Sequence, residues 1–211
     1  MSRPLLYDFG PSTYARTVRM LLHEKGVGYD TVQVNVLEGE TQGPEHLARH
    51  PFGKVPVLEH DGRRVLETTA ICGYVDATFD GPSFVPGGAW DRARMDTVTS
   101  FVDGYGYKAM VWDVAIQQLM PEAVGGLDEA KLERGREDMT KLLVHLMGLR
   151  DDSPWLAGNE RSVADFYLAP CCAYVSMTPD AGRLSDVRGF DDWWSRVQAL
   201  DSFGATAPDL G

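Results

Sequence analysis

Residues 55–75 read VPVLEHDGRRVLETTAICGYV, and this stretch specifies half of a small fold. The pair Asp61-Gly62 separates two apolar runs, which is the strongest short-range signal for a β-hairpin. After Thr68 the apolar residues Ile71 and Val75 recur at helical spacing. The stretch therefore predicts a strand, a tight turn, a second strand and a helix.

The residues before this stretch predict a strand–helix–strand unit. Residues 5–9 form a short apolar run, and Gly10-Pro11-Ser12-Thr13 interrupts it. From Ala15 the pattern is helical as far as Gly26, a residue type that commonly ends helices. Valines alternate with polar residues through 29–36, which predicts a strand that is half-exposed or at an edge. With the hairpin and its helix, the order βαβ then ββα describes a small α/β domain of about 80 residues.

Beyond residue 80 the composition and the spacing of the apolar residues change. Residues 81–88, GPSFVPGG, are typical of a linker. No convincing strand follows, and residues 90–120 and 128–149 have the period of long helices. We expect an α/β domain at 1–80, a linker at 81–89 and an all-helical domain at 90–211.

The helical domain contains a clear helix start. Ser162-Val-Ala-Asp165 has the spacing of a capping box, so Asp165 is expected to be structural. The apolar run 166–175 follows, and Pro170 inside it should bend the helix or end it. An amphipathic stretch at 191–200 predicts a last helix.

Charge and composition limit the partners. The formal net charge is -11, and such an acidic surface repels nucleic acid and anionic membranes. No long apolar run and no basic-then-apolar N-terminal segment occurs, so we expect a cytoplasmic protein. The odd number of cysteines, Cys72, Cys171 and Cys172, argues against a disulfide framework.

One pair of histidines has a spacing that metal sites also use. His46 and His50 are four residues apart, but the glutamate of an HExxH motif is missing and Pro51 ends any helix there. We therefore expect two solvent-facing histidines and no metal.

Four segments of the chain, in their order along the sequence and at their spacing, match the motifs of a known family. They are LYDFGPST at 6–13 with Val18-Arg19, EHLARHPFGKVP at 45–56, ETTAI at 67–71, and LAG at 156–158 with SVAD at 162–165. Together they resemble the cytosolic glutathione S-transferase family, and most of all its serine-type, phi-like bacterial members. The resemblance implies a thioredoxin-like α/β N-terminal domain, an all-α C-terminal domain and glutathione as co-substrate.

The resemblance assigns the activation of the glutathione thiol to Ser12. This serine follows the first strand at the entry to the first helix, where a hydroxyl and a helix N-terminus can both stabilise a thiolate. A simple helix cap is the structural alternative. Thr13 is the first catalytic alternative, and Tyr7 is the second.

The resemblance also implies the glutathione-binding residues. Val55-Pro56 would be a cis peptide whose Val55 backbone pairs with the cysteinyl part. Glu67 would bind the γ-glutamyl ammonium, and Thr68, at a helix N-terminus, the γ-glutamyl carboxylate. Lys54 could reach the glycyl carboxylate. Each also has an ordinary structural interpretation: a trans proline at an edge strand, a strand-end glutamate, a helix cap and a solvated lysine.

The chain departs from the phi-like pattern at three places. Thr41-Gln42 stands where a His-Lys pair is usual, His50 replaces an asparagine, and Thr68 replaces a serine while keeping the hydroxyl. The contacts of the glycyl end are therefore the least constrained.

A small hydrophobic electrophile should lie between the domains, facing Ser12. The candidate residues, for which core packing is the alternative, are Phe9, Phe101, Tyr105, Tyr107 and Trp112.

The function that follows is conjugation, RX + GSH → GS-R + HX, as in detoxification. A glutathione-dependent isomerase, dehalogenase or peroxidase is possible on the same fold, and so is a non-catalytic scaffold protein. By the resemblance we expect a homodimer.

Overall fold

The structure is a computed structural model that describes residues 2–208, and their contacts divide into two units. The first unit comprises the residues up to Phe84 together with those from Leu200, and the second unit runs from Val85 to Ala199. The sequence-based division continued the helical domain to the C-terminus, whereas the segment from Leu200 belongs with the first unit.

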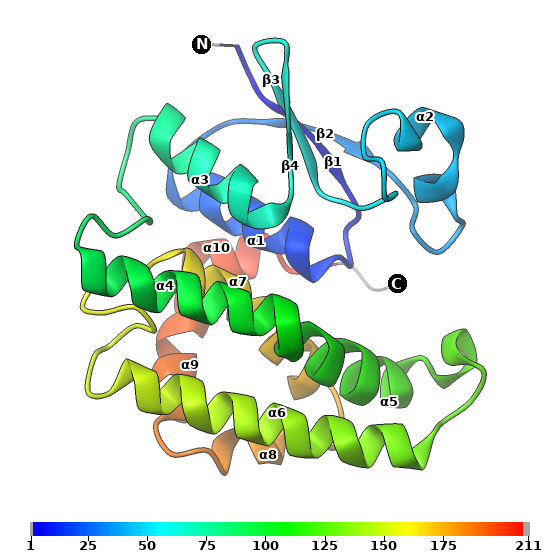
Figure 1. The fold of residues 1–211 in the computed structure, drawn as a ribbon, viewed down its shortest axis with the longest axis vertical. Coiled ribbons are helices and arrows are strands. Elements are labelled where there is room, and N and C mark those ends of the chain that lie inside the picture. Colours follow the sequence, from blue (N-terminus) through cyan, green and yellow to red (C-terminus); the bar gives the residue numbers. More distant parts are fainter. Residues whose placement is uncertain (1, 209–211) are drawn as a thin grey trace. The chain divides into compact units, whose positions relative to one another are not determined.

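The first unit is built on a four-stranded sheet (Figure 1). Its strands are β1 (Leu5–Asp8), β2 (Asp30–Gln33), β3 (Val57–His60) and β4 (Arg63–Leu66). The order is β2-β1-β3-β4, with β1 parallel to β2, and with β3 antiparallel to both β1 and β4. The predicted βαβ unit, edge strand and hairpin are thus confirmed. In the hairpin turn, Asp61 and Gly62 have φ angles of 49° and 73°, the left-handed geometry that a tight Asp-Gly turn requires.

Helices cover the sheet of this unit. The helix α1 (Thr13–Glu24) buries Ala15, Val18, Leu21 and Leu22, the predicted apolar face. It packs beside α3 (Thr68–Thr78) on one face of the sheet (Figure 1). Residues 40–50 contain two single helical turns, η1 (Glu40–Gln42) and α2 (Pro44–Leu47).

A short last helix, α10 (Asp201–Ala205), packs against α1 and was not predicted. The contact rests on Arg16, whose guanidinium carbon lies 4.4 Å from the centroid of the Phe203 ring. Arg16 also donates to the Phe203 carbonyl oxygen at 2.7 Å. A buried cation can thus join two helices of one unit because its charge is satisfied by a ring face and a carbonyl.

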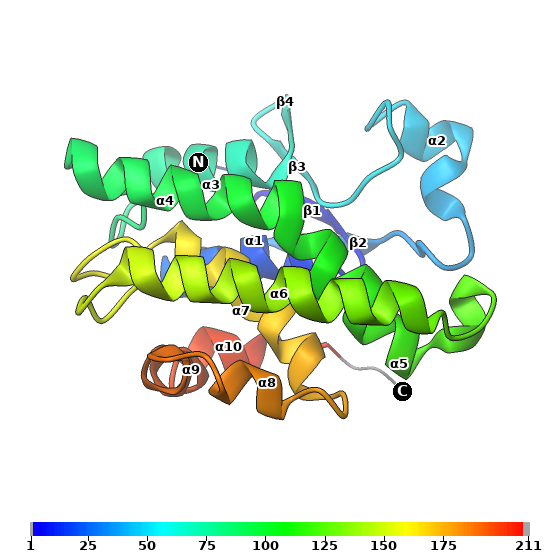
Figure 2. The ribbon, with the colours of Figure 1, turned by 60° about the horizontal axis from the view of Figure 1, so that its bottom comes forward.

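In the second unit, residues 85–199, all the named elements of regular structure are helices, joined by loops (Figure 2). Its elements are α4 (Ala89–Phe101), η2 (Val102–Ile116), α5 (Gln117–Leu119), η3 (Pro121–Val124), α6 (Glu129–Arg150), α7 (Val163–Ser176), α8 (Gly182–Ser185) and α9 (Phe190–Gln198). From α4 to α5 the chain is one continuous helical run, and its middle part, η2, is a wider π-helix. The helix α6 lies closely against η2, since a Cβ at Gly135 would fall 2.7 Å from the Asp113 Cβ.

The helix α7 confirms one prediction and corrects another. It begins with the predicted capping box, in which Ser162 and Asp165 satisfy each other's backbone N–H groups. It does not end at Pro170, because the helix continues to Ser176. Pro170 is buried among the apolar residues of this helix, so packing outweighs the lost backbone hydrogen bond. Among residues 2–208, no helix is both long enough and apolar enough to cross a membrane.

Candidate active site

Three loops of the first unit meet at one end of the sheet. Because Tyr7 pairs with Val57 and Val57 pairs with Leu66, the end of β1, the start of β3 and the end of β4 are neighbours. The candidate residues Ser12, Val55 and Glu67 belong to these three loops. Two strand spacings span about 10 Å, which is also roughly the length of an extended tripeptide. The topology therefore brings the predicted catalytic and binding segments within a distance that one glutathione molecule could span.

Ser12 lies at the N-cap of α1 with its side chain half-buried. Its Oγ accepts a hydrogen bond from the Ala15 N–H at 3.2 Å, and its own N–H donates to the Phe9 carbonyl oxygen at 2.8 Å. As a cap the hydroxyl acts only as an acceptor, and its hydrogen has no acceptor among the described residues. The cap and the proposed thiolate donor are therefore compatible functions of one side chain.

The two alternative hydroxyls are less accessible or already occupied. Thr13 is buried, with 4% of its surface exposed, and its Oγ1 has no hydrogen-bond partner within residues 2–208. The Tyr7 hydroxyl donates to the Glu59 carboxylate at 3.2 Å, and the Arg49 guanidinium lies 4.4 Å from the centroid of the Tyr7 ring. The geometry favours Ser12 over both, although its function stays a proposal.

A buried polar network holds the loop that carries Ser12. Arg19 Nη1 contacts the Asp8 carboxylate at 2.7 and 2.9 Å, and Arg19 Nη2 donates to the Gly10 carbonyl oxygen at 2.8 Å. Gln33 accepts from the Gly10 N–H at 3.3 Å. The sequence does not indicate that Arg19 is buried, because a helical pattern does not show which charged side chains turn inward.

We expect Arg19→Lys to lower the free energy of unfolding by about 1–2 kcal/mol, since one ammonium cannot replace both the carboxylate and the Gly10 contacts. Denaturant unfolding measures the change. Arg63→Lys is the matched control, because Arg63 is exposed and its side chain makes no hydrogen bond or ion pair among the described residues, and it should change stability by less than about 0.5 kcal/mol. Equal effects of the two substitutions would contradict the proposed support of the loop.

The segment before β3 has the predicted cis bond between Val55 and Pro56. Val55 is half-buried, and within residues 2–208 neither its N–H nor its C=O makes a hydrogen bond. The Lys54 side chain is exposed. Gly53, with φ +57°, lets this segment lie against 41–42, because a Cβ there would be 2.5 Å from the Thr41 carbonyl oxygen.

The prediction of two solvent-facing histidines is wrong. His46 and His50 are each only 2% exposed. His46 Nε2 bonds to the Lys54 carbonyl oxygen at 2.9 Å, and His50 Nδ1 accepts from the Phe52 N–H at 3.2 Å. Both rings therefore turn inward to hold the chain between α2 and β3, a contact that no local spacing indicates.

Glu67 and Thr68 form the junction of β4 and α3. Glu67 has φ +68° and ψ 128°, which is strained for any residue other than glycine, and its side chain is 74% exposed. Thr68, 6% exposed, is the first residue of α3, where backbone N–H groups favour an anion. Strain of this kind is common where a side chain must present itself to a ligand.

The predicted electrophile residues differ in exposure. Phe9 is half-buried in the loop after β1. Phe101 is half-buried and contacts the rings of Tyr105 and His145 at centroid distances of 5.7 and 5.2 Å. Tyr105 and Trp112 are 65% and 45% exposed, which disfavours the core-packing alternative for these two. Tyr107 is half-buried, and burial raises the pKa of its hydroxyl above the ordinary value.

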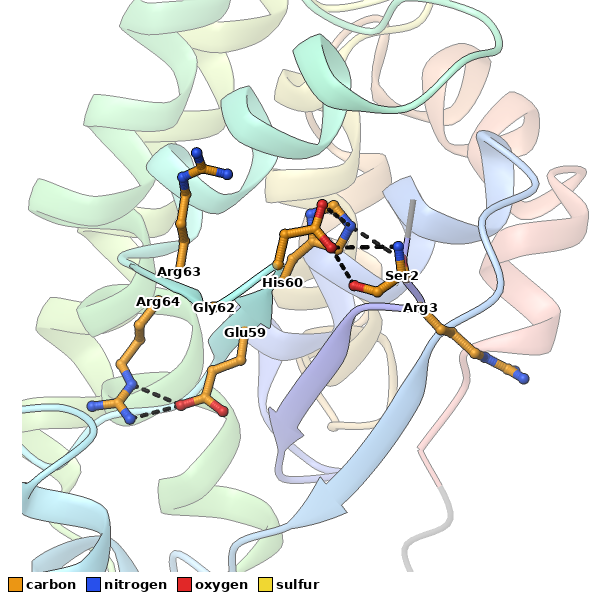
Figure 3. A pocket seen from close by; sticks show the side chains of 8 residues that line it. Ser2, Arg3, Glu59, His60, Gly62, Arg63 and Arg64 are labelled. Carbon is orange, nitrogen blue, oxygen red and sulfur yellow. Dashed lines mark hydrogen bonds and ion pairs between the residues drawn. The ribbon is translucent and has the colours of Figure 1, made fainter.

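A shallow pocket lies at the opposite end of the sheet (Figure 3). Its walls come from the start of β1 and from the hairpin, and it carries charges of both signs, as in the contact of Glu59 with Arg64 at 2.7 Å. None of the predicted site residues lines it. It therefore belongs to neither the predicted catalytic nor the predicted binding segments.

Comparisons with known proteins match both units. The glutathione S-transferase N-terminal domain matches residues 4–77, and the C-terminal domain matches residues 110–201. Glutathione S-transferase 1 of Zea mays is 30% identical over 182 residues, covering 86% of this chain and 85% of that protein.

A maleylacetoacetate isomerase of Rhizobium meliloti is 41% identical over 91 residues, which is 43% of either chain. The solved structure of glutathione S-transferase-I bound with lactoylglutathione has a TM-score of 0.86 and 26% identity, covering 98% of this chain and 99% of that one.

Proposed function

Because the chain belongs to the glutathione transferase family, we propose that it binds glutathione in its first unit and transfers the thiolate sulfur to a small electrophile. The sulfur attacks the electrophilic carbon, the leaving group departs with its bonding electrons, and the thiol proton goes to solvent. The observation that carries the proposal is Ser12, whose Oγ caps α1 while its hydrogen has no acceptor in the described chain.

The energetics are consistent with one hydroxyl as the activator. A free thiol has a pKa of about 8.5, and lowering it by about two units requires ~2.7 kcal/mol in favour of the thiolate. A hydrogen bond to a charged acceptor contributes ~1.5–3 kcal/mol, and a helix N-terminus ~0.3–1 kcal/mol. Ser12 and the start of α1 together can therefore keep a substantial fraction of glutathione ionised at neutral pH.

The other residues of the site would bind the remainder of glutathione. The unpaired Val55 backbone is suited to the cysteinyl part. Glu67 would bind the γ-glutamyl ammonium, while Thr68 and the N-terminus of α3 would bind its carboxylate. The exposed Lys54 would reach the glycyl carboxylate.

In the second unit, the electrophile would contact the aromatic side chains Phe101, Tyr105, Tyr107 and Trp112. The exposed rings of Tyr105 and Trp112 on η2 suit a small hydrophobic molecule better than an ionic one. The expectations of a homodimer, of a cytoplasmic location and of a detoxifying function remain proposals drawn from the family.

Calorimetric titration with glutathione, followed by ultraviolet absorbance of the thiolate across pH, tests this function. We expect binding, and a thiolate signal that persists below the pKa of free glutathione. S-methylglutathione is the control, because it should bind without giving that signal. Absence of glutathione binding would sink the enzyme hypothesis and favour the scaffold alternative.

A glutathione-dependent isomerase is a second candidate. The similarity to maleylacetoacetate isomerase favours it, although it covers under half of the chain. An isomerase releases glutathione unchanged, so substrate would be converted without loss of thiol. A transferase consumes one thiol for each product formed, and a thiol count during turnover therefore separates the two activities.

A further inference from the structure

His50 is a buried ring beside Glu67, the residue proposed to bind the γ-glutamyl ammonium. It is 2% exposed, and its two nitrogens face different partners. Nδ1 accepts from the Phe52 N–H at 3.2 Å, and Nε2 lies 3.5 Å from Glu67 Oε1. The ring thus connects the loop before β3 with the N-cap residue of α3.

The hydrogen-bond pattern assigns the tautomer of His50. Burial lowers the pKa of the imidazole, with the nearby His46 and Lys54 acting in the same direction and Glu67 acting against them. The ring is therefore neutral at physiological pH. Since Nδ1 accepts a hydrogen bond, the single ring proton lies on Nε2, which faces the carboxylate.

Glu67 has few other restraints. It is the N-cap of α3, yet its side chain makes no capping hydrogen bond. Among the described residues, His50 is the one side chain within ion-pair distance of its carboxylate. The backbone conformation of Glu67, with φ +68°, sets the direction in which its side chain leaves the chain. The His50 Nε2–H then limits the rotamers that its carboxylate can adopt.

We propose that His50 is a positioning residue, whose Nε2–H holds the Glu67 carboxylate ready for the γ-glutamyl ammonium. The proposal rests on the proposed function. A carboxylate that is already oriented loses less side-chain freedom when the ligand arrives, so glutathione binds more tightly. The effect is specific to the ammonium, because His50 acts through the one residue that would pair with it.

Two substitutions separate the two nitrogens of the ring. His50→Asn places an oxygen near the position of Nδ1, so it keeps an acceptor for the Phe52 N–H, as an Asx turn does. His50→Gln places an amide near the position of Nε2, so it keeps a donor for Glu67. Calorimetry then compares glutathione with an analogue in which hydrogen replaces the γ-glutamyl amino group.

We expect His50→Asn to weaken glutathione binding about threefold to tenfold, which is the range for the net contribution of an ordinary hydrogen bond, because Glu67 is largely exposed to water. The analogue should be affected by less than about twofold, since it lacks the ammonium. His50→Gln should restore most of the lost affinity for glutathione. In a Glu67→Gln background, His50→Asn should cause no further loss, as expected for two residues that act as one.

Other outcomes overturn the proposal. Equal weakening of glutathione and analogue by His50→Asn, or weakening by His50→Gln alone, would mean that His50 only supports the loop. Should His50→Asn fail to fold, nitrogen NMR of the wild-type histidines decides, because a proton on Nδ1 excludes the proposed contact. If the wild type does not bind glutathione, both the proposed function and the proposal for His50 fail. The other outcomes overturn only the proposal for His50.

Discussion

Ser12→Ala is expected to lower turnover at neutral pH by about 10- to 100-fold, while glutathione still binds. The substitution removes one hydrogen bond to the thiolate, worth ~1.5–3 kcal/mol, and such an energy corresponds to this range of rates. The loss should shrink as pH rises, because above the pKa of the free thiol glutathione ionises without help. Conjugation rates and thiolate absorbance across pH would therefore shift together toward alkaline values.

The cap function of Ser12 needs a separate control. Alanine also removes the acceptor of the Ala15 N–H, which costs about 1 kcal/mol of stability, whereas glycine is a tolerated N-cap and costs only a few tenths. Ser12→Gly should therefore lose activity as Ser12→Ala does, with less effect on the melting temperature.

If the thiolate survives in both variants, Ser12 is not the activator. Thr13→Val and then Tyr7→Phe become the decisive substitutions. The buried Thr13 Oγ1, which lacks a partner in the described chain, makes Thr13 the first of the two.

The first unit could be predicted from sequence because its signals are local. Asp61 and Gly62 have the left-handed backbone conformation of a tight turn, which the Asp-Gly pair predicts. The alternation of valines with polar residues predicted a half-exposed or edge strand, and β2 lies at the edge of the sheet. The apolar face of α1 could be predicted from its period alone. The same local signals placed Ser12 at a helix start, which is where it lies.

The features that sequence reasoning missed depend on tertiary partners. Arg16 is buried because α10 returns to cover it, and Arg19 because Asp8 and Gly10 accept its hydrogen bonds. His46 and His50 are buried because the loop after α2 folds back over them. No spacing in the chain indicates these contacts, since each joins segments that pack only in the folded state.

The capping box of α7 is a case in which a local signal identified a residue with a wider structural function. Asp165 is fully buried, and burial raises the pKa of its carboxyl while its hydrogen bonds oppose that shift. Oδ2 accepts from the Ser162 N–H at 2.8 Å, as predicted. Oδ1 accepts from the Leu156 N–H at 3.0 Å and from the Trp193 indole N–H at 2.9 Å, neither of which the motif indicates.

Asp165→Ala is therefore expected to lower the free energy of unfolding by ~3–5 kcal/mol, because four buried donors, the Ser162 hydroxyl included, would lose their acceptor at once. That is a large part of the ~5–15 kcal/mol that stabilises an ordinary protein. Urea unfolding, followed by tryptophan fluorescence, measures the loss. Trp193→Phe removes a single donor and leaves the other three bonds intact, so it should cost about 1–2 kcal/mol. If Asp165→Ala costs no more than Trp193→Phe, the carboxylate is only a helix cap, and α7 is held to its neighbours by apolar packing alone.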